Sequence, residues 1–326
     1  MRQLLSTLLA RCATAVAATA LLTLTACSSD NGGSDNGNGS DWSEMRNDNA
    51  NRTGDKATRR LEVPKLHATG NQLIIVHKLS TEGNTTTVSN KKTTFDSDAV
   101  NFITEWDCDK KSQRWSCYQM HRGYNGSYSR VTNGEYPQDP NIPSSYRYDD
   151  LYWGSGFQHG HICPSADRTF SREANYQTFY MSNMQPQYPK FNGYDDNNKN
   201  IKGLWLRMEN KVQTWAKSLA KTDTLYICKG GTIDKSDQIL THIKNKLIVP
   251  KYFFMAVLRK DGDIWEAMAF YVDQTNSWRT NETLLSHAMS IDELEEKTGI
   301  DFFCNLPDKI EDKVEKTFTP KRWGLE

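Results

Sequence analysis

The chain has 326 residues, its 40 lysines and arginines are balanced by 40 aspartates and glutamates, and 11% of its residues are aromatic. Zero formal charge excludes a histone-like polycation but is compatible with a local basic groove for nucleic acid. The aromatic content excludes a wholly disordered chain. Beyond residue 30 no stretch approaches the roughly 20 apolar residues of a spanning helix, so the sequence does not predict an integral membrane protein.

The first 26 residues predict an export signal. Arg2 and Arg11 accompany a short apolar run that ends in Leu-Thr-Ala-Cys at residues 24–27. Because this ending resembles the bacterial lipobox, we expect residues 1–26 to be a lipoprotein signal peptide and Cys27 to be lipidated. The domain would then be exported and anchored to a bacterial cell membrane, at the periplasmic or surface face of an outer membrane. An ordinary signal peptide with a chance cysteine is the alternative.

A polar segment follows the signal. Residues 28–41 contain only Ser, Asp, Asn and Gly, a composition that cannot bury apolar surface. We therefore expect a disordered polar linker over residues 27–66 and one folded domain over residues 67–320.

The chain has seven cysteines, and an exported protein lies where disulfides persist. Cys108 and Cys117 flank a polar turn between two strand-like runs, so we expect a bridge across this hairpin. The sequence does not pair Cys163, Cys228 and Cys304.

The folded part begins with strand patterns. Residues 72–79 form an apolar run, and residues 100–106 and 115–121 predict a hairpin. Residues 123–150 are rich in Gly, Asn, Pro, Ser and Tyr, which indicates a long surface connection. Residues 177–181 are a short β-prone run.

Residues 203–221 predict the clearest helix, because large apolar side chains recur at steps of three and four residues. A strand over 225–228 follows, and the runs 252–258 and 264–272 flank Asp261-Gly262, a strong hairpin signal. Further on, Ser290 and Glu293 form a capping box at the start of a short helix that Gly299 ends.

Three polar clusters, at 156–168, 181–187 and 191–210, carry the candidate chemistry. Each has an ordinary structural explanation when taken alone. His161 could be a packed core histidine, and Asn183 could cap a turn. Glu209 borders the apolar face of the predicted helix, so its carboxylate needs a partner there, either a salt bridge or the water shell of a metal.

Taken together, the clusters resemble the DNA/RNA non-specific endonuclease family, the ββα-metal or His-Me finger nucleases. The family core runs Asp-Arg-Gly-His, a nearby Pro, Ser-Asn-x-x-Pro-Gln, an Asn, a Gly-x-Trp helix start and a Glu four residues after the Trp. The matching positions are Gly160-His161, Pro164, Ser182-Asn183, Pro186-Gln187, Asn192, Gly203-x-Trp205 and Glu209. The resemblance extends over residues 72–305.

The resemblance implies an α+β fold with a mixed, largely antiparallel sheet and a ββα-metal motif. It also implies that His161 is the general base, that Asn192 binds one Mg²⁺ (or Mn²⁺), and that Asn183 and Glu209 orient the base and the waters of the metal. The substrates would be DNA and RNA, bound mainly through the phosphate backbone, and the products would carry 5′-phosphate ends. A histidine with its unperturbed pKa of ~6.5 suits proton transfer at neutral pH, and one divalent ion can neutralise the phosphate.

The sequence departs from the family pattern in two places. Gln158-His159 replaces Asp-Arg before Gly160, so His159, Arg130 and Arg168 are the candidates for contact with the phosphate. An insertion before Gly203 leaves two candidate metal ligands. Asn192 keeps the spacing from the Pro-Gln pair and ranks first, whereas Asn200 keeps closer spacing to the helix.

Other interpretations remain open on the sequence. One alternative is a zinc site formed by His159, His161 and Cys163, because alternate residues of a strand point to the same face. The spacing is unusual for zinc, and the sequence shows no evident fourth ligand. A lipid-anchored binding module without catalysis is a second alternative, since the Asp-Arg pair is missing. The aromatic residues of 123–153 could stack on bases or pack this segment against the core.

Overall fold

The structure is a computed structural model that describes residues 45–67, 70–88, 91–122, 126, 128–131, 134–220 and 223–325. Trp42–Glu326 form one compact unit. The predicted signal peptide, Cys27 and the start of the predicted linker lie outside the described residues. Within these ranges, no helix combines the length and apolarity that crossing a bilayer requires.

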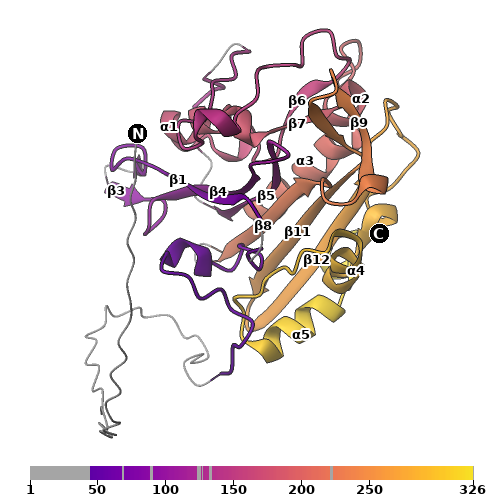
Figure 1. Ribbon diagram of the computed structural model, residues 1–326. Coiled ribbons are helices and arrows are strands. Elements are labelled where there is room, and N and C mark those ends of the chain that lie inside the picture. The colour runs from indigo at the N-terminus through magenta and orange to yellow at the C-terminus, as the bar shows by residue number, and fades with distance from the viewer. Residues whose placement is uncertain are drawn as a thin grey trace, which may run out of the picture. The chain divides into compact units, whose positions relative to one another are not determined.

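A seven-stranded sheet forms the centre of this unit (Figure 1). Its strands, in spatial order, are β1 Gln72–Lys78, β4 Val100–Asp107, β5 Ser112–His121, β8 Thr224–Gly231, β11 Tyr252–Asp261, β12 Ile264–Asp273 and β13 Ala288–Met289. Every pair of neighbours in it is antiparallel. The predicted α+β class with a largely antiparallel sheet is confirmed.

Shorter elements surround this sheet. Three two-stranded sheets pair β2 Thr85–Val88 with β3 Lys91–Thr94, β6 Gln158–His161 with β7 Met184–Gln187, and β9 Ile239–Ile243 with β10 Leu247–Pro250. The α-helices are α1 Arg172–Gln177, α2 Pro189–Asn192, α3 Leu204–Ser218, α4 Ile291–Thr298 and α5 Asp308–Lys316. The 3₁₀ turns are η2 Lys56–Arg59, η3 Ser144–Tyr146, η4 Ser165–Asp167, η5 Met181–Asn183, η6 Ser236–Gln238, η7 Leu285–His287 and η8 Pro320–Trp323.

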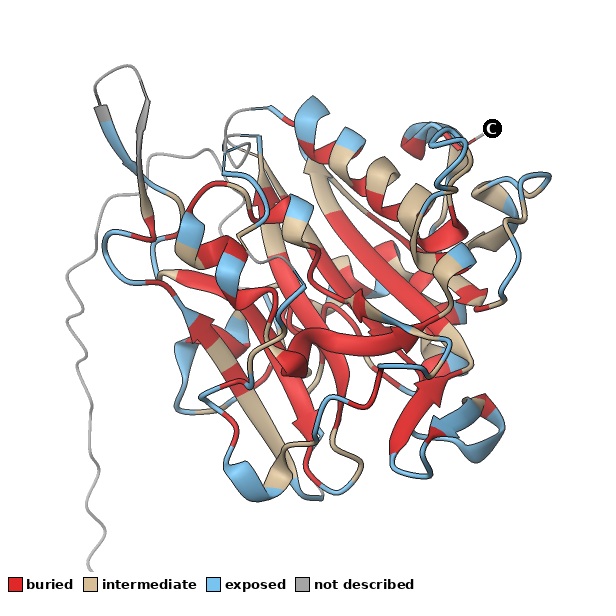
Figure 2. Cartoon of the chain, turned by 90° about the horizontal axis from the view of Figure 1, so that it is seen from above, coloured by how far each residue is buried: buried red, intermediate tan, exposed pale blue. Residues whose placement is uncertain are grey.

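The large sheet is covered on both faces. Along β11, Phe253, Met255 and Val257 belong to the core on the side of α3, whereas the alternate residues Phe254 and Ala256 belong to the core beneath α4 and α5. Successive side chains of a strand point to opposite faces, so a strand buried on both sides is apolar along its length. Figure 2 shows the central strands buried along most of their length.

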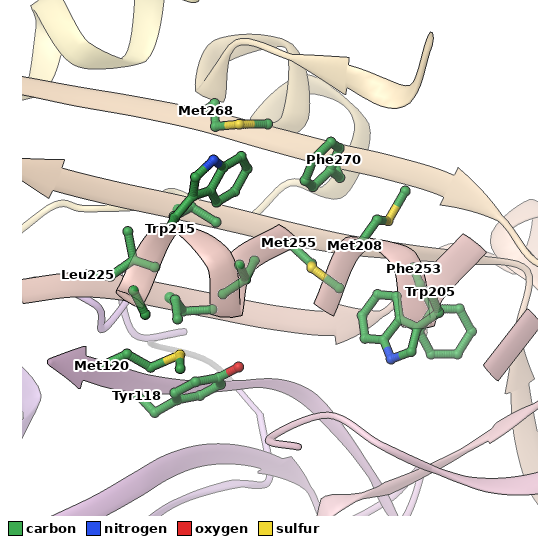
Figure 3. Packing of buried hydrophobic residues seen from close by; sticks show 14 of the residues in the cluster. Tyr118, Met120, Trp205, Met208, Trp215, Leu225, Phe253, Met255, Met268 and Phe270 are labelled. Atoms are coloured by element: carbon green, nitrogen blue, oxygen red, sulfur yellow. The ribbon is translucent and has the colours of Figure 1, made fainter. Parts of the chain in front are cut away.

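The helix α3 matches the helix predicted from the spacing of large apolar residues. Trp205, Met208 and Trp215 of its buried face pack against β11 and β12, as Figure 3 shows. Trp215 also donates a hydrogen bond of 2.9 Å from Nε1 to the carbonyl of Trp323. The folded unit therefore continues past residue 320, where the sequence placed its end.

The local turn and cap signals are realised where the sequence predicted them. β11 and β12 join through a turn in which Gly262 has φ +63°, a left-handed conformation that favours glycine. Ser290 and Glu293 form both hydrogen bonds of a capping box, and Gly299 ends α4 with φ +70°. The β-prone run at 177–181 was predicted wrongly, because Ser171 caps α1 and the chain continues from it into η5.

The predicted Cys108–Cys117 bridge is wrong. All five described cysteines are buried and free. Cys117 pairs with Ile103 on β4, five residues before Cys108. At about 3.3 Å per residue the two cysteines are about 16 Å apart along the strand, far beyond the ~7 Å that a disulfide spans. The neighbour that Cys117 faces across the sheet is Cys228.

Residues 45–66, expected in the disordered linker, belong to the folded unit. Val63 is fully buried, and Asn51 is 4% exposed and donates to the carbonyl of Pro64 at 2.9 Å. Asn305 accepts from the backbone N–H of Asn51 at 2.9 Å. Polar side chains of this segment form buried amide hydrogen bonds with the rest of the folded unit. Amino-acid composition alone does not reveal such contacts, so the sequence suggested disorder.

Candidate active site

The three polar clusters come together in a strand–strand–helix unit. The short strands β6 and β7 pair antiparallel, with His161 opposite Met184, and α2 and α3 follow β7 along the chain. Gly203 joins α2 to α3: its N–H donates to Gly193 at 2.7 Å, and an added Cβ would lie 2.2 Å from the carbonyl oxygen of Phe191. Only glycine permits this approach, which brings the end of α2 against the start of α3.

His161 is the last residue of β6, and its ring lies half-buried at the wall of a pocket. Its Nε2 is buried and has no hydrogen-bond partner among the described residues. Burial, followed by the charge of Arg130, lowers the pKa of His161 to about 3. The imidazole is therefore neutral at physiological pH, and this lowered pKa makes it a weaker base than the unperturbed histidine that the sequence suggested.

Asn183 fixes the backbone beside His161. Its side-chain oxygen accepts from the N–H of Cys163 at 2.9 Å, and its amide donates to the carbonyls of Cys163 and Thr178, each at 2.8 Å. The backbone oxygen of Asn183 accepts from Ile162 as well. Asn183 is fully buried and is not among the residues that line the pocket, so the structure places it behind the histidine rather than in the solvent-filled space.

The pocket has a volume of about 940 Å³ and receives residues from all parts of the unit. Among the predicted site residues, it is lined by Arg130, His159, His161, Asn192 and Glu209. Asn200, the alternative metal ligand, is exposed and does not line it. The structure thus brings Asn192, rather than Asn200, to the cavity that holds the histidine.

Glu209 is held by a buried ion pair. Lys229 lies at an alternate position of β8 on the face that α3 covers, and its Nζ donates to Oε1 of Glu209 at 2.9 Å. The same ammonium group lies 4.6 Å from the ring centroid of Trp205. Burial raises the pKa of Glu209 and the charge of Lys229 opposes this rise. A partner for Glu209 was expected, and it is this lysine.

The donor atoms at the pocket fit one hard divalent cation that keeps most of its waters. Asn192 offers an amide oxygen, Glu209 offers a carboxylate, and the unpartnered Nε2 of His161 stands at the same cavity. Mg²⁺ prefers oxygen ligands and binds through few protein groups. The zinc alternative fits less well, because burial raises the pKa of Cys163 to about 12 and keeps its thiol protonated in the core.

His159 occupies the position of the missing family arginine but is held in an aromatic stack. Its ring lies between Tyr136 and Tyr152, with centroid distances of 3.7 and 3.9 Å. Nε2 of His159 lies 3.1 Å from a carboxylate oxygen of Asp150. Burial lowers the pKa of His159 and Asp150 opposes this shift, so His159 does not replace a permanent guanidinium charge.

Of the two arginines expected to contact phosphate, one reaches the pocket. Arg130 is exposed at the pocket wall, with its guanidinium 4.5 Å from the ring centroid of Phe179. Arg168 is 1% exposed, lies over the ring of Tyr118 at 4.4 Å and donates to the carbonyl of Gln119 at 3.0 Å. The substrate-binding role predicted for Arg168 is wrong, because this arginine belongs to the protein interior.

Sequence analysis missed Lys229, which lies behind the pocket as the partner of Glu209, and several residues that line the pocket. Lys229 carried one signal, since a lysine inside an otherwise apolar strand needs a buried partner. Tyr136 and Tyr152 were noted only as part of an aromatic-rich segment. Trp153 lines the pocket and is 93% exposed, and no pattern in the sequence distinguished it from its packed neighbours.

A histidine at the end of a two-stranded unit, facing an amide and a carboxylate carried by the helices that follow, defines a nuclease of the ββα-metal type. The model of the DNA/RNA non-specific endonuclease family matches residues 79–309. The chain belongs to this family and is a nuclease, and metal dependence is a general property of its members.

The relatives agree with this assignment. A nuclease of Nostoc sp. is 30% identical over 225 residues, which cover 66% of this chain and 75% of the relative. Nuclease C1 of Cunninghamella echinulata is 26% identical over 180 residues, covering 53% and 68%. The solved EndoG/EndoGI complex contains a chain with TM-score 0.52 and 18% identity, covering 63% of this chain and 84% of that one, which shows a shared fold.

We predict that Lys229→Met destabilises the protein by about 3–5 kcal/mol and removes activity, because it leaves the Glu209 carboxylate buried without its partner. The double variant Lys229→Met/Glu209→Gln should regain most of the stability and none of the activity. Urea unfolding and plasmid cleavage measure the two effects. Lys217→Met, an exposed change on α3, the helix that carries Glu209, is the control, and unchanged stability of Lys229→Met would refute the role of the pair.

Proposed function

We propose that this chain hydrolyses phosphodiester bonds of both DNA and RNA with little sequence preference, using one Mg²⁺ and leaving 5′-phosphate ends. Mn²⁺ is the alternative ion. The observation that carries the proposal is the neutral, unpartnered imidazole of His161 at the same pocket as Asn192 and Glu209.

Phosphodiester hydrolysis needs a base for the attacking water and compensation for charge on the phosphate. Nε2 of His161 would accept the proton of the water, since it is unprotonated at neutral pH and has no hydrogen-bond partner among the described residues. Asn183 holds the backbone that carries this ring. Asn192 and Glu209 would hold a Mg²⁺ ion, which would supply positive charge near the phosphate.

The remaining residues provide the binding surface. Asn192 and Glu209 are the groups that would hold the ion and its waters, and Lys229 keeps the Glu209 side chain in place. Arg130 adds a positive charge at the pocket wall and replaces the arginine that the family has beside the histidine. Contacts to the phosphate backbone of a nucleic acid do not distinguish one base from another, which agrees with low sequence preference.

His161→Ala should lower the rate of DNA and RNA cleavage by about 100-fold or more, since it removes the general base. Plasmid and RNA cleavage with and without Mg²⁺ measures this loss, and fluorescence anisotropy measures binding in parallel. His242→Ala, an exposed histidine on β9, is the matched control and should cleave normally. Binding without cleavage by the unmodified chain would instead support a catalytically inactive binding module.

Trp153 stands at the rim of the pocket, with nearly its whole surface free to stack on a base. Stacking on an aromatic side chain is sequence-tolerant and worth about 1–3 kcal/mol per base. Trp153→Ala should therefore raise KM for single-stranded substrates about fivefold or more and leave kcat nearly unchanged. Tyr176→Ala, an exposed aromatic residue that does not line this pocket, is the control. A fall in kcat alone would count against stacking.

We further propose that the nuclease is exported and anchored to a bacterial membrane through lipidated Cys27, with residues 28–41 as a tether. The support is the signal pattern and the cysteine at its end. Cys27→Ser should abolish incorporation of an alkyne-tagged fatty acid and move the protein from the membrane to the soluble fraction. Cys12→Ser should do neither, because residue 12 lies inside the removed signal. Labelling of the Cys27→Ser chain would overturn the anchor.

A further inference from the structure

The helices α4 and α5 pack side by side on the other face of the large sheet (Figure 1). Residues of these two helices, of the segment between them and of the N-terminal segment line a second polar cavity. Its volume is about 300 Å³. Every charged residue that lines it is acidic; the lining comprises Asp48, Asn49, Glu295, Asp301, Asp308, Glu311, Asp312 and Glu315. The nuclease site uses none of these residues.

The carboxylates of this cavity converge on Glu315. Oxygen atoms of Asp292, Glu295 and Glu315 lie within 4.8 Å of one another, and so do those of Asp301, Glu311 and Glu315. The groups come from α4, from the segment between α4 and α5, and from α5. Like charges at these separations repel strongly unless something compensates them.

Glu315 supplies a second and independent observation. Its Oε1 is buried and has no hydrogen-bond partner among the described residues. The ion pairs found within those residues include none of Glu295, Asp301, Glu311 and Glu315. An unpaired buried carboxylate oxygen costs several kcal/mol as an anion, so this oxygen is available to a cation.

Hydrogen-bond donors and cations near the cavity compensate only part of the negative charge of its carboxylates. The side-chain amide of Asn49 donates to Asp301 at 3.1 Å and to Glu311 at 2.7 Å. The charge of Lys65 opposes the rise that burial causes in the pKa of Asp301. The ammonium group of Lys65, however, donates its hydrogen bond to the backbone carbonyl of Asn49. At the rim, Arg46 lies 3.6 Å from Asp308 and is exposed. None of these contacts reaches the buried oxygen of Glu315.

We propose that this cluster binds a Ca²⁺ ion, with Glu315 as the shared central ligand. Ca²⁺ takes 6–8 oxygen ligands, often several carboxylates, and the two overlapping groups bring five carboxylates together around Glu315. Mg²⁺ requires a tighter octahedron, with opposite oxygens about 4.2 Å apart, and prefers to keep its waters. The number of carboxylates therefore favours Ca²⁺.

Protonation is the competing way to relieve the repulsion. Burial and the surrounding acids raise the pKa of Glu295 to about 8 and that of Glu315 to about 9. Without a cation, the folded state then holds more protons than the unfolded state above pH 5, so its stability falls as the pH rises toward 9. A bound Ca²⁺ displaces these protons and removes the loss.

Binding would join three parts of the chain that are distant in sequence. Asn49 lies in the N-terminal segment, Glu295 in α4 and Glu315 in α5. A cation bound by the folded state alone stabilises it in proportion to its concentration. The site would thus act as a calcium-dependent clasp on the N-terminal segment and the helices of this face, separate from the catalytic ion.

The test uses the full chain with Asn192→Ala, so that the nuclease site does not contribute to cation binding. After dialysis against a chelator, Ca²⁺ or Mg²⁺ is titrated while calorimetry measures binding and thermal unfolding measures Tm. We expect one Ca²⁺ per chain, a Tm rise of several degrees at about 1 mM Ca²⁺, and at least about tenfold weaker binding of Mg²⁺.

Glu315→Gln in the same background should lose the Ca²⁺ response. It should be no less stable than its parent in chelator, because glutamine adds no charge to the acidic cluster, and this separates loss of the site from misfolding. Glu296→Gln, an exposed change on α4 outside the cluster, should keep the full response.

Three outcomes would overturn the proposal. The first is the absence of both binding heat and a Tm shift up to about 10 mM Ca²⁺, above the range of weak extracellular calcium sites. The second is an equal response in Glu315→Gln. The third is a Tm that falls equally between pH 6 and pH 9 with and without Ca²⁺, which would show that the cluster is relieved by protons alone. Cleavage by the unmodified chain is scored separately, so failure here leaves the nuclease proposal intact.

Discussion

The ion pair between Glu209 and Lys229 is the contact on which the nuclease site depends. It links α3 to the central strand β8 at the point where the apolar interface between helix and sheet meets the pocket. Neither charge tolerates burial alone, so the pair specifies how α3 sits on the sheet. The apolar face of α3 supplies most of the binding between helix and sheet. The ion pair adds the requirement that the carboxylate face the same cavity as His161.

His161 illustrates how burial sets the protonation state of a side chain at the pocket. A more exposed imidazole near positive charges would still be partly protonated around pH 6, whereas burial keeps His161 neutral. Asn183 contributes by holding the backbone that carries the ring, not by touching the substrate. The loss of the family's Asp-Arg pair is accommodated in the same pocket: His159 is stacked between two tyrosines, and Arg130 provides the positive charge.

The two faces of the large sheet have different tasks. On one face, α3 and the short strands β6 and β7 assemble the nuclease site. On the other face, α4 and α5 gather an excess of carboxylates that the described residues do not neutralise. Both sites can form on one sheet, because alternate side chains of each strand serve opposite cores.

The sequence by itself determined the elements whose signals are local. Helix α3, the turn at Gly262 and the capping box at Ser290 follow from periodicity and from the chemistry of a few adjacent residues. It also determined the family and the candidate residues His161, Asn192 and Glu209, because their order along the chain is distinctive. Only the tertiary structure decided the partners of these residues. The pairing of Lys229 with Glu209, the burial of Arg168, the separation of Cys108 from Cys117 and the folding of residues 45–66 all join positions distant in sequence or use buried polar hydrogen bonds. Such contacts depend on which strands become neighbours, and neither composition nor spacing carries that information.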